Sequence, residues 1–316
     1  MKLLALAAWG LGGALLLITL AAALALRPDI SRADLAQEYG RPDERMVTLA
    51  SGVILHIRDA GRRDGPPLIL LHGFAGNLCA WDGWTERLGD RYRVISVDWI
   101  GHGQTPPPPA TANTDPAIVI GELADALGLA RFALAGNSMG GAFAWRFAGA
   151  QPQRVAALIL VDSGGAPTDA AAMQRRFALA ANPLVGFLLR WAGGPFVMGF
   201  TVRSGFADPS KITPADVRLA DRMYRAAGNR GVLLARVRAG FDSRDGLALL
   251  AAITAPTLLM HGDQDTLVSL AETEELAAAI KGSRVQRYPA LGHVPHQEDT
   301  AATAADARAF LAAHGW

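Results

Sequence analysis

The pentapeptide Gly136-Asn137-Ser138-Met139-Gly140 limits the possible folds of this chain more than any other stretch. The apolar residues 131–135 before it predict a buried strand, and residues 142–148 after it predict a helix. A serine on a sharp turn between a strand and a helix exposes its hydroxyl, and flanking glycines allow that turn to close. The free N–H groups at the start of the helix suit a developing oxyanion. The pattern therefore favours Ser138 as a nucleophile.

Strands alternate with helices along most of the chain. Apolar or alternating segments predict eight strands, at residues 46–49, 53–57, 67–71, 93–97, 131–135, 155–161, 256–260 and 284–288. The first two read as an antiparallel hairpin, and helical patterns follow several of the others. This alternation predicts an α/β fold, with a mostly parallel eight-stranded sheet and helices on both faces.

Residues 164–246 interrupt the alternation, because they contain helical patterns broken by proline and glycine but no convincing buried strand. An insertion between two strands of such a sheet lies over the active site, so we predict a helical cap here. The α/β core then consists of residues 45–163 and 247–316. The single cysteine, Cys79, excludes an intrachain disulfide. A net charge of +1 gives no reason to expect a nucleic-acid partner.

The first 26 residues predict a membrane anchor. No charged residue occurs from Leu3 to Leu26, and this run exceeds the roughly 7–15 apolar residues of a secretory signal. It is long enough to span a bilayer, which takes about 20 residues. We expect a single-pass anchor in the inner membrane, with the side of the catalytic domain left open by the flanking charges. An uncleaved signal, or secretion after signal cleavage, is the alternative. Residues 27–44 then form a connector.

A nucleophilic serine needs a base, and the base needs a carboxylate that holds its tautomer. In a fold of this kind they follow in the order serine, acid, histidine, each on a loop after a strand. Asp265 and His293 follow the last two predicted strands in that order, so we assign them as acid and base of Ser138. Asp263 in the same turn and Asp162 after an earlier strand are the alternative acids.

The oxyanion formed during acyl transfer needs two backbone N–H donors. One is expected from Met139, the residue after the nucleophile, and the other from Phe74 in the loop His72-Gly73-Phe74. His72 and His102 are expected to support loop structure, with no part in proton transfer.

Taken together, these motifs resemble the α/β-hydrolase fold superfamily over residues 45–315. The matching motifs occur in the family's order: His72-Gly73-Phe74, Asp98-Trp99-Ile100-Gly101-His102-Gly103, Gly136-Asn137-Ser138-Met139-Gly140-Gly141, Gly262-Asp263-Gln264-Asp265 and Gly292-His293. The resemblance implies a triad of Ser138, Asp265 and His293 with oxyanion donors Phe74 and Met139. It implies no metal and no organic cofactor.

The serine turn is similar to that of C–C bond hydrolases acting on ring-cleavage products, and to that of membrane-anchored monoacylglycerol lipases and carboxylesterases. Those C–C hydrolases usually carry tryptophan after the catalytic histidine, where this chain has Val294. Ser138 also differs from the aspartate nucleophile of epoxide hydrolases and haloalkane dehalogenases. We therefore expect a carboxylesterase or lipase acting on an amphiphilic or apolar ester, with the oligomeric state left open. A C–C hydrolase and a non-catalytic ligand receptor are the alternatives.

Overall fold

The computed structural model describes residues 27–167, 182, 185–186, 194–239 and 246–316. The anchor predicted at residues 1–26 lies outside the described residues. Among the residues that are described, no helix is both long enough and apolar enough to cross a membrane.

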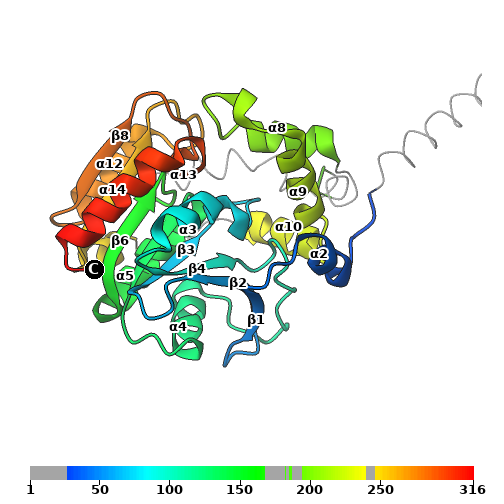
Figure 1. The fold of residues 1–316 in the computed structure, drawn as a ribbon, viewed down its shortest axis with the longest axis horizontal. Coiled ribbons are helices and arrows are strands. Elements are labelled where there is room, and N and C mark those ends of the chain that lie inside the picture. Colours follow the sequence, from blue (N-terminus) through cyan, green and yellow to red (C-terminus); the bar gives the residue numbers. More distant parts are fainter. Residues whose placement is uncertain (1–26, 168–181, 183–184, 187–193, 240–245) are drawn as a thin grey trace, which may run out of the picture.

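A sheet of eight strands forms the centre of the molecule, in the order β1-β2-β4-β3-β5-β6-β7-β8 (Figure 1). The pairs β1–β2 and β2–β4 are antiparallel, and all other neighbours are parallel. The strands are β1 (Glu44–Thr48), β2 (Ile54–Gly61), β3 (Pro67–Leu71), β4 (Arg93–Asp98), β5 (Phe132–Asn137), β6 (Val155–Val161), β7 (Thr257–Gly262) and β8 (Arg284–Tyr288). The predicted fold class is confirmed.

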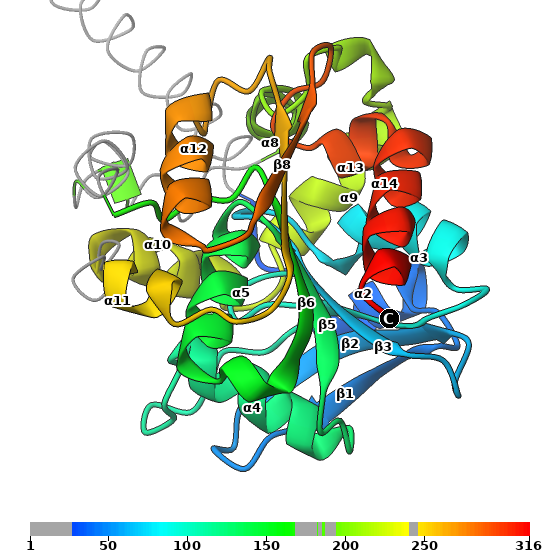
Figure 2. The ribbon, with the colours of Figure 1, turned by 90° about the vertical axis from the view of Figure 1, so that its left-hand side faces the viewer.

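Helices cover both faces of the sheet, which Figure 2 shows between its two helical layers. These helices are α3 (Asp82–Leu88), α4 (Pro116–Ala126), α5 (Met139–Ala150), α11 (Gly246–Ala251), α12 (Leu270–Ala279), α13 (Pro295–Glu298) and α14 (Thr300–Ala313). In β3, Leu68 and Leu70 belong to the core with α3 and α14, whereas Ile69 and Leu71 belong to the core with α4 and α5. Burial on both faces explains the continuous apolar runs of the central strands.

Three helices from the predicted cap lie over loops of the core: α8 (Pro195–Arg203), α9 (Pro214–Tyr224) and α10 (Asn229–Ala239). The loop after β4 approaches α10 so closely that a Cβ atom on Gly101 would lie 2.7 Å from Val232. Near α8, the Glu298 carboxylate accepts hydrogen bonds from the N–H groups of Ala207 and Asp208, at 3.1 and 2.8 Å. The cap is therefore fixed to the core at two separate loops.

The segment predicted as a connector contains α2 (Arg32–Tyr39) and binds the cap just before this helix. Ile30 donates a backbone hydrogen bond to Arg225 and accepts one from Ala227, at 2.8 and 3.0 Å. The Arg32 guanidinium donates to the carbonyl groups of Gln104, Thr105 and Ala227, at 2.8–2.9 Å. Residues 30–32 thus join the cap to the loop after β4.

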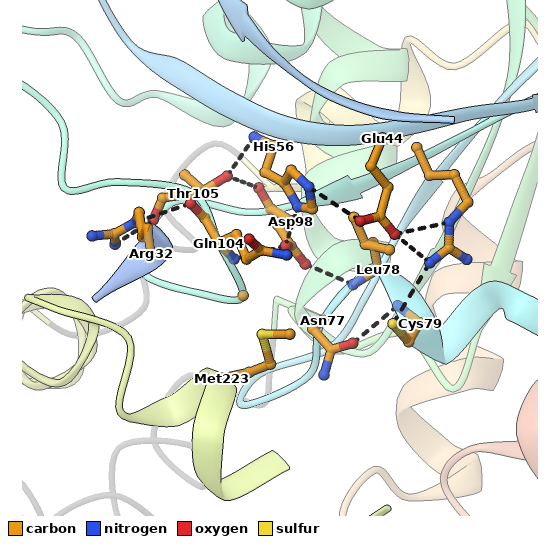
Figure 3. A network of polar contacts seen from close by, with 12 residues as sticks. Arg32, Glu44, His56, Asn77, Leu78, Cys79, Asp98, Gln104, Thr105 and Met223 are labelled. Atoms are coloured by element: carbon orange, nitrogen blue, oxygen red, sulfur yellow. Dashed lines mark hydrogen bonds and ion pairs between the residues drawn. The ribbon is translucent and has the colours of Figure 1, made fainter. Parts of the chain in front are cut away.

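A buried network around His56 holds the loops that follow β3 and β4 (Figure 3). The His56 imidazole lies between Asp98, at 2.7 Å from Nδ1, and Glu44, at 3.5 Å from Nε2. The Asp98 carboxylate also accepts from the N–H groups of Leu78 and Gln104, at 2.7 and 2.8 Å. Burial by itself would lower the pKa of His56, but the hydrogen bonds to Asp98 and Glu44 outweigh burial and raise this pKa to about 9.

The free energy of unfolding should depend on pH through His56. Because the folded pKa of about 9 exceeds the unfolded value of 6.5, its contribution is complete below pH 6.5 and is lost as pH rises through about 9. The contribution is on the order of 3 kcal/mol. We expect the wild type to have a larger free energy of unfolding than His56→Gln at pH 6.5, and the difference to shrink as the pH rises to about 9. Denaturant unfolding of the two proteins at several pH values measures this difference.

The exposed His314 provides the matched control, because His314→Gln removes a histidine from the end of α14 without touching the network. It should unfold like the wild type at every pH. A constant stability gap between wild type and His56→Gln across the window would contradict the assignment of a charged His56.

Candidate active site

Ser138 stands between β5 and α5 in a strained backbone conformation, with φ 53° and ψ −115°. A non-glycine residue with positive φ persists only where its surroundings over-determine it. The close packing here provides that constraint, because a Cβ atom on Gly136 would lie 2.3 Å from the Gly140 carbonyl oxygen. One on Gly140 would lie 2.3 Å from the Leu71 carbonyl oxygen. The two glycines therefore allow the turn that exposes the Ser138 hydroxyl.

The structure brings Asp265 and His293 together, with Asp265 Oδ2 at 2.7 Å from His293 Nδ1. The other carboxylate oxygen, Oδ1, accepts from the N–H groups of Leu267 and Val268, at 2.6 and 3.1 Å. Burial opposes the charge of Asp265, but the bond to His293 and these N–H donors lower its pKa below the ordinary value. Asp265 is therefore an ionised carboxylate that orients the imidazole.

Asn137, the residue before the nucleophile, ties the histidine loop to the serine turn. Its side-chain amide donates to the carbonyl oxygens of His293 and Val161, at 3.0 and 3.1 Å. The Nδ1 atom of His293 is engaged by Asp265, so any proton exchange at this imidazole would take place at Nε2. The sequence motif alone predicts no role for Asn137, although this residue stands inside it.

The predicted oxyanion loop lies directly against the nucleophile. A Cβ atom on Gly73 would be 2.8 Å from Asn137 Oδ1 and 3.2 Å from Ser138 Cβ. This contact places the loop that leads to Phe74 beside the serine turn. Backbone N–H groups from these two residues can stabilise negative charge on a substrate oxygen.

Two buried histidines hold the oxyanion loop through its backbone. His72 accepts from the N–H of Trp99 at 3.0 Å, and its Nδ1 lies 2.7 Å from the Gly73 carbonyl oxygen. His102 accepts from the N–H of Ala75 at 3.1 Å. Burial lowers the pKa of both histidines, so both are neutral near pH 7. Their contacts fit the loop-supporting role expected from the sequence.

The two alternative acids have other partners. Asp263 forms a bidentate ion pair with Arg287 at 2.8 and 2.9 Å, away from His293. Asp162 is fully buried and accepts at Oδ1 from the N–H of Gly262 at 3.0 Å. Burial, followed by the charge of Asp265, raises the pKa of Asp162 well above its ordinary value. Burial therefore favours the neutral form of Asp162, whereas the hydrogen bonds of Asp265 favour its charged form.

Asp162, His261 and Asp265 also form the cluster closest to a metal-binding arrangement among the described residues, with one side-chain atom of each within 4.8 Å of the others. The donor set fits a cation poorly. Burial favours the neutral form of Asp162, which is a poor ligand for a cation, and both oxygens of Asp265 already accept hydrogen bonds. The cluster is better suited to sharing a proton between carboxyl groups.

The residues after His293 support its loop. Glu298 accepts from the N–H of Gly292 at 2.9 Å, in addition to its bonds near α8. His296 is buried against the Trp81 ring, 4.2 Å between ring centres, and burial lowers its pKa to about 3.

Burial raises the pKa of the Cys79 thiol to about 12, so this thiol is unreactive at neutral pH.

Comparison with known proteins places these features in a family. The family described as alpha/beta hydrolase fold matches residues 66–300. Lipase 3 of Moraxella is 30% identical, over 84% of this chain and 84% of its own. The pimeloyl-[acyl-carrier protein] methyl ester esterase of Aromatoleum aromaticum is 29% identical, over 75% of this chain and 95% of its own.

Solved structures show the same architecture. A bacterial membrane phospholipase A superposes with a TM-score of 0.74 at 26% identity, covering 97% of this chain and 98% of its own. A meta-cleavage product hydrolase of Pseudomonas fluorescens gives a TM-score of 0.71 at 23% identity, over 84% of this chain and 96% of its own. The second likeness, at this identity, concerns the fold alone.

Replacing Asp265 with asparagine should lower kcat roughly 10⁴-fold, because the histidine then loses the partner that fixes its tautomer. Asp162→Asn should retain most of the activity, since an uncharged amide replaces an already neutral acid. Initial rates on a p-nitrophenyl ester measure both effects, with Asp263→Asn as the surface control. Loss of activity in Asp162→Asn comparable to that in Asp265→Asn would move the catalytic acid to the loop after β6.

Proposed function

We propose, from the premise that the chain belongs to the alpha/beta hydrolase fold family, that it is a serine hydrolase of carboxylic esters. The observation that carries the proposal is the Asp265–His293 pair joined to the strained Ser138 turn by Asn137. The ester and lipase activities in the names of the Moraxella and Aromatoleum relatives support the same class of reaction.

In this proposal Ser138 Oγ attacks the ester carbonyl carbon and His293 Nε2 accepts its proton. The oxyanion is bound by the N–H groups of Phe74 and Met139. Collapse of the tetrahedral intermediate releases the alcohol, which takes the proton from His293. Water then attacks the acyl-enzyme with His293 as base, and Asp265 stabilises the imidazolium in both halves of the reaction.

We further propose that the substrate is an amphiphilic lipid ester and that residues 1–26 hold the enzyme at a membrane. The membrane phospholipase A, named for its membrane location, matches 97% of this chain in fold and supports this proposal. Val294 after the histidine, in place of tryptophan, favours ester hydrolysis over C–C bond hydrolysis.

Ser138→Ala should reduce kcat on p-nitrophenyl esters by about 10⁶-fold, because the acyl-enzyme cannot form. A fluorophosphonate probe should label the wild type and leave the variant unlabelled, while thermal unfolding of the two proteins stays the same. Retention of more than a few per cent of the activity by pure Ser138→Ala would refute the proposed nucleophile. Absent labelling of a folded wild type would favour the ligand-receptor alternative.

The membrane attachment can be tested with the full chain expressed in bacteria. We expect the full chain to stay in the membrane fraction after washes with high salt and with alkaline carbonate, and to be released by detergent. The reason is that a span of about 20 apolar residues is held in the bilayer by the hydrophobic effect, which salt and alkali do not weaken as they weaken ionic contacts. The chain beginning at Pro28 is the control and should stay in the supernatant. Release of the full chain by salt alone would contradict an inserted anchor.

A further inference from the structure

Arg236 on α10 lies over an aromatic surface next to the nucleophile helix. Its guanidinium carbon is 4.9 Å from the centre of the Phe143 ring, and that ring lies 4.8 Å from the ring of Trp99. Phe143 comes five residues after Ser138, which is about 7.5 Å along a helix axis at 1.5 Å per residue. The guanidinium thus lies over the first turns of the helix that follows Ser138.

Arg236 is partly buried and has no carboxylate partner among the described residues, whereas several other arginines of this chain do. Arg58 pairs with Glu44 at 2.6 Å, and Arg225 pairs with Asp221 at 3.1 Å. Arg230, also in α10, pairs with Asp29. Within the described part of the chain, these three guanidinium groups are paired with carboxylates and Arg236 is held against an aromatic ring.

An aromatic ring compensates little of the cost of burying a cation. A cation–π contact contributes about 0.5–2 kcal/mol, whereas removing an ion from water costs several kcal/mol. Burial accordingly lowers the pKa of Arg236, and no neighbouring acid raises it. A partly buried guanidinium without a carboxylate partner is stabilised most by a ligand that supplies an anionic group.

The surroundings of Arg236 connect it to the oxyanion loop. Burial is the main cause of the low pKa of His102, and the positive charge of Arg236 lowers it further. The His102 ring in turn lies 5.8 Å from the ring of Phe74. A small recess of about 10 Å³ lies between residues 75–76, residues 101–103 and the cap, and it is bordered by Leu233, one turn before Arg236.

We propose that Arg236 binds an anionic group of the substrate, a carboxylate or a phosphate, while the ester carbonyl lies at Ser138. The planar guanidinium can donate two parallel hydrogen bonds to either group. The Phe143 ring beneath it would keep the guanidinium in place. This inference rests on the proposed ester hydrolysis and adds a substrate class, namely esters that carry a negative charge several bonds from the scissile carbonyl.

Two pairs of substrates test the charge preference separately on each side of the ester. On the acyl side, the p-nitrophenyl monoester of glutaric acid is compared with p-nitrophenyl pentanoate, which has a methyl group where the first has a carboxylate. On the alcohol side, a monodecanoyl glycerophosphate is compared with monodecanoylglycerol. The pair that shows the preference identifies the anion as an acyl carboxylate or a headgroup phosphate.

Arg236→Gln should lower kcat/KM for the anionic member of one pair by roughly 10- to 100-fold, the range expected for loss of a charged hydrogen bond. The kcat/KM for the neutral member of the same pair should change less than about twofold, because that substrate has no anion to bond to the guanidinium. Arg236→Lys should recover part of the loss, because it keeps the charge without the planar fork. Arg238→Gln, an exposed arginine on the same helix, is the matched control and should change neither ratio.

Binding to Ser138→Ala, measured by calorimetry with the same anionic esters, tests the site without turnover. Adding Arg236→Gln should weaken this binding by a factor similar to the change in kcat/KM. An unchanged anionic-to-neutral ratio in both pairs, together with unchanged binding, would overturn the role of Arg236 and leave ester hydrolysis standing. A wild type that binds the anionic esters through Arg236 but hydrolyses none of the four would refute ester hydrolysis alone.

Discussion

The contact between Gly140 and the carbonyl oxygen of Leu71 fixes the geometry on which the rest of the site depends. A side chain at Gly140 would collide with this oxygen, at 2.3 Å from a Cβ atom. Leu71 ends β3 and leads into the oxyanion loop, whereas Gly140 lies in the first turn of α5, which follows Ser138. This one packing contact therefore sets the distance between the Ser138 turn and the loop that is expected to stabilise an oxyanion.

Charge is distributed around this contact by burial and hydrogen bonding more than by residue type. Asp162 and Asp265 both have buried side chains, yet backbone N–H donors and His293 favour the charged form of Asp265 while burial favours the neutral form of Asp162. His72 and His102 are likewise neutral because they are buried and bonded to backbone groups. The ionised carboxylate beside His293 is thus not repelled by its buried neighbour.

The sequence predicted the sheet, the serine turn and the order of the candidate triad because the apolar runs of the sequence mark where each strand lies along the chain. In a parallel sheet the loops after successive strands meet at one edge, so Ser138, Asp265 and His293 could be assigned from their positions alone. Asn137 and Arg236 escaped such reasoning, and Asp162 was identified from the sequence only as an alternative acid. Their roles depend on distances between loops and on burial, which periodicity does not encode. The binding of Ile30 and Arg32 to the cap escaped it for the same reason.

The short segment at residues 30–32 has a mechanical consequence. It hydrogen-bonds to the turn between α9 and α10 through Ile30, and to the loop after β4 through Arg32. A load applied to the chain ahead of this point is shared by the cap and the loop bearing His102 before it reaches the sheet. A flexible linker of equal length would keep the catalytic domain attached but would leave the domain free to rotate. A force on the chain ahead of Ile30 therefore acts on the cap and on the loop after β4 together.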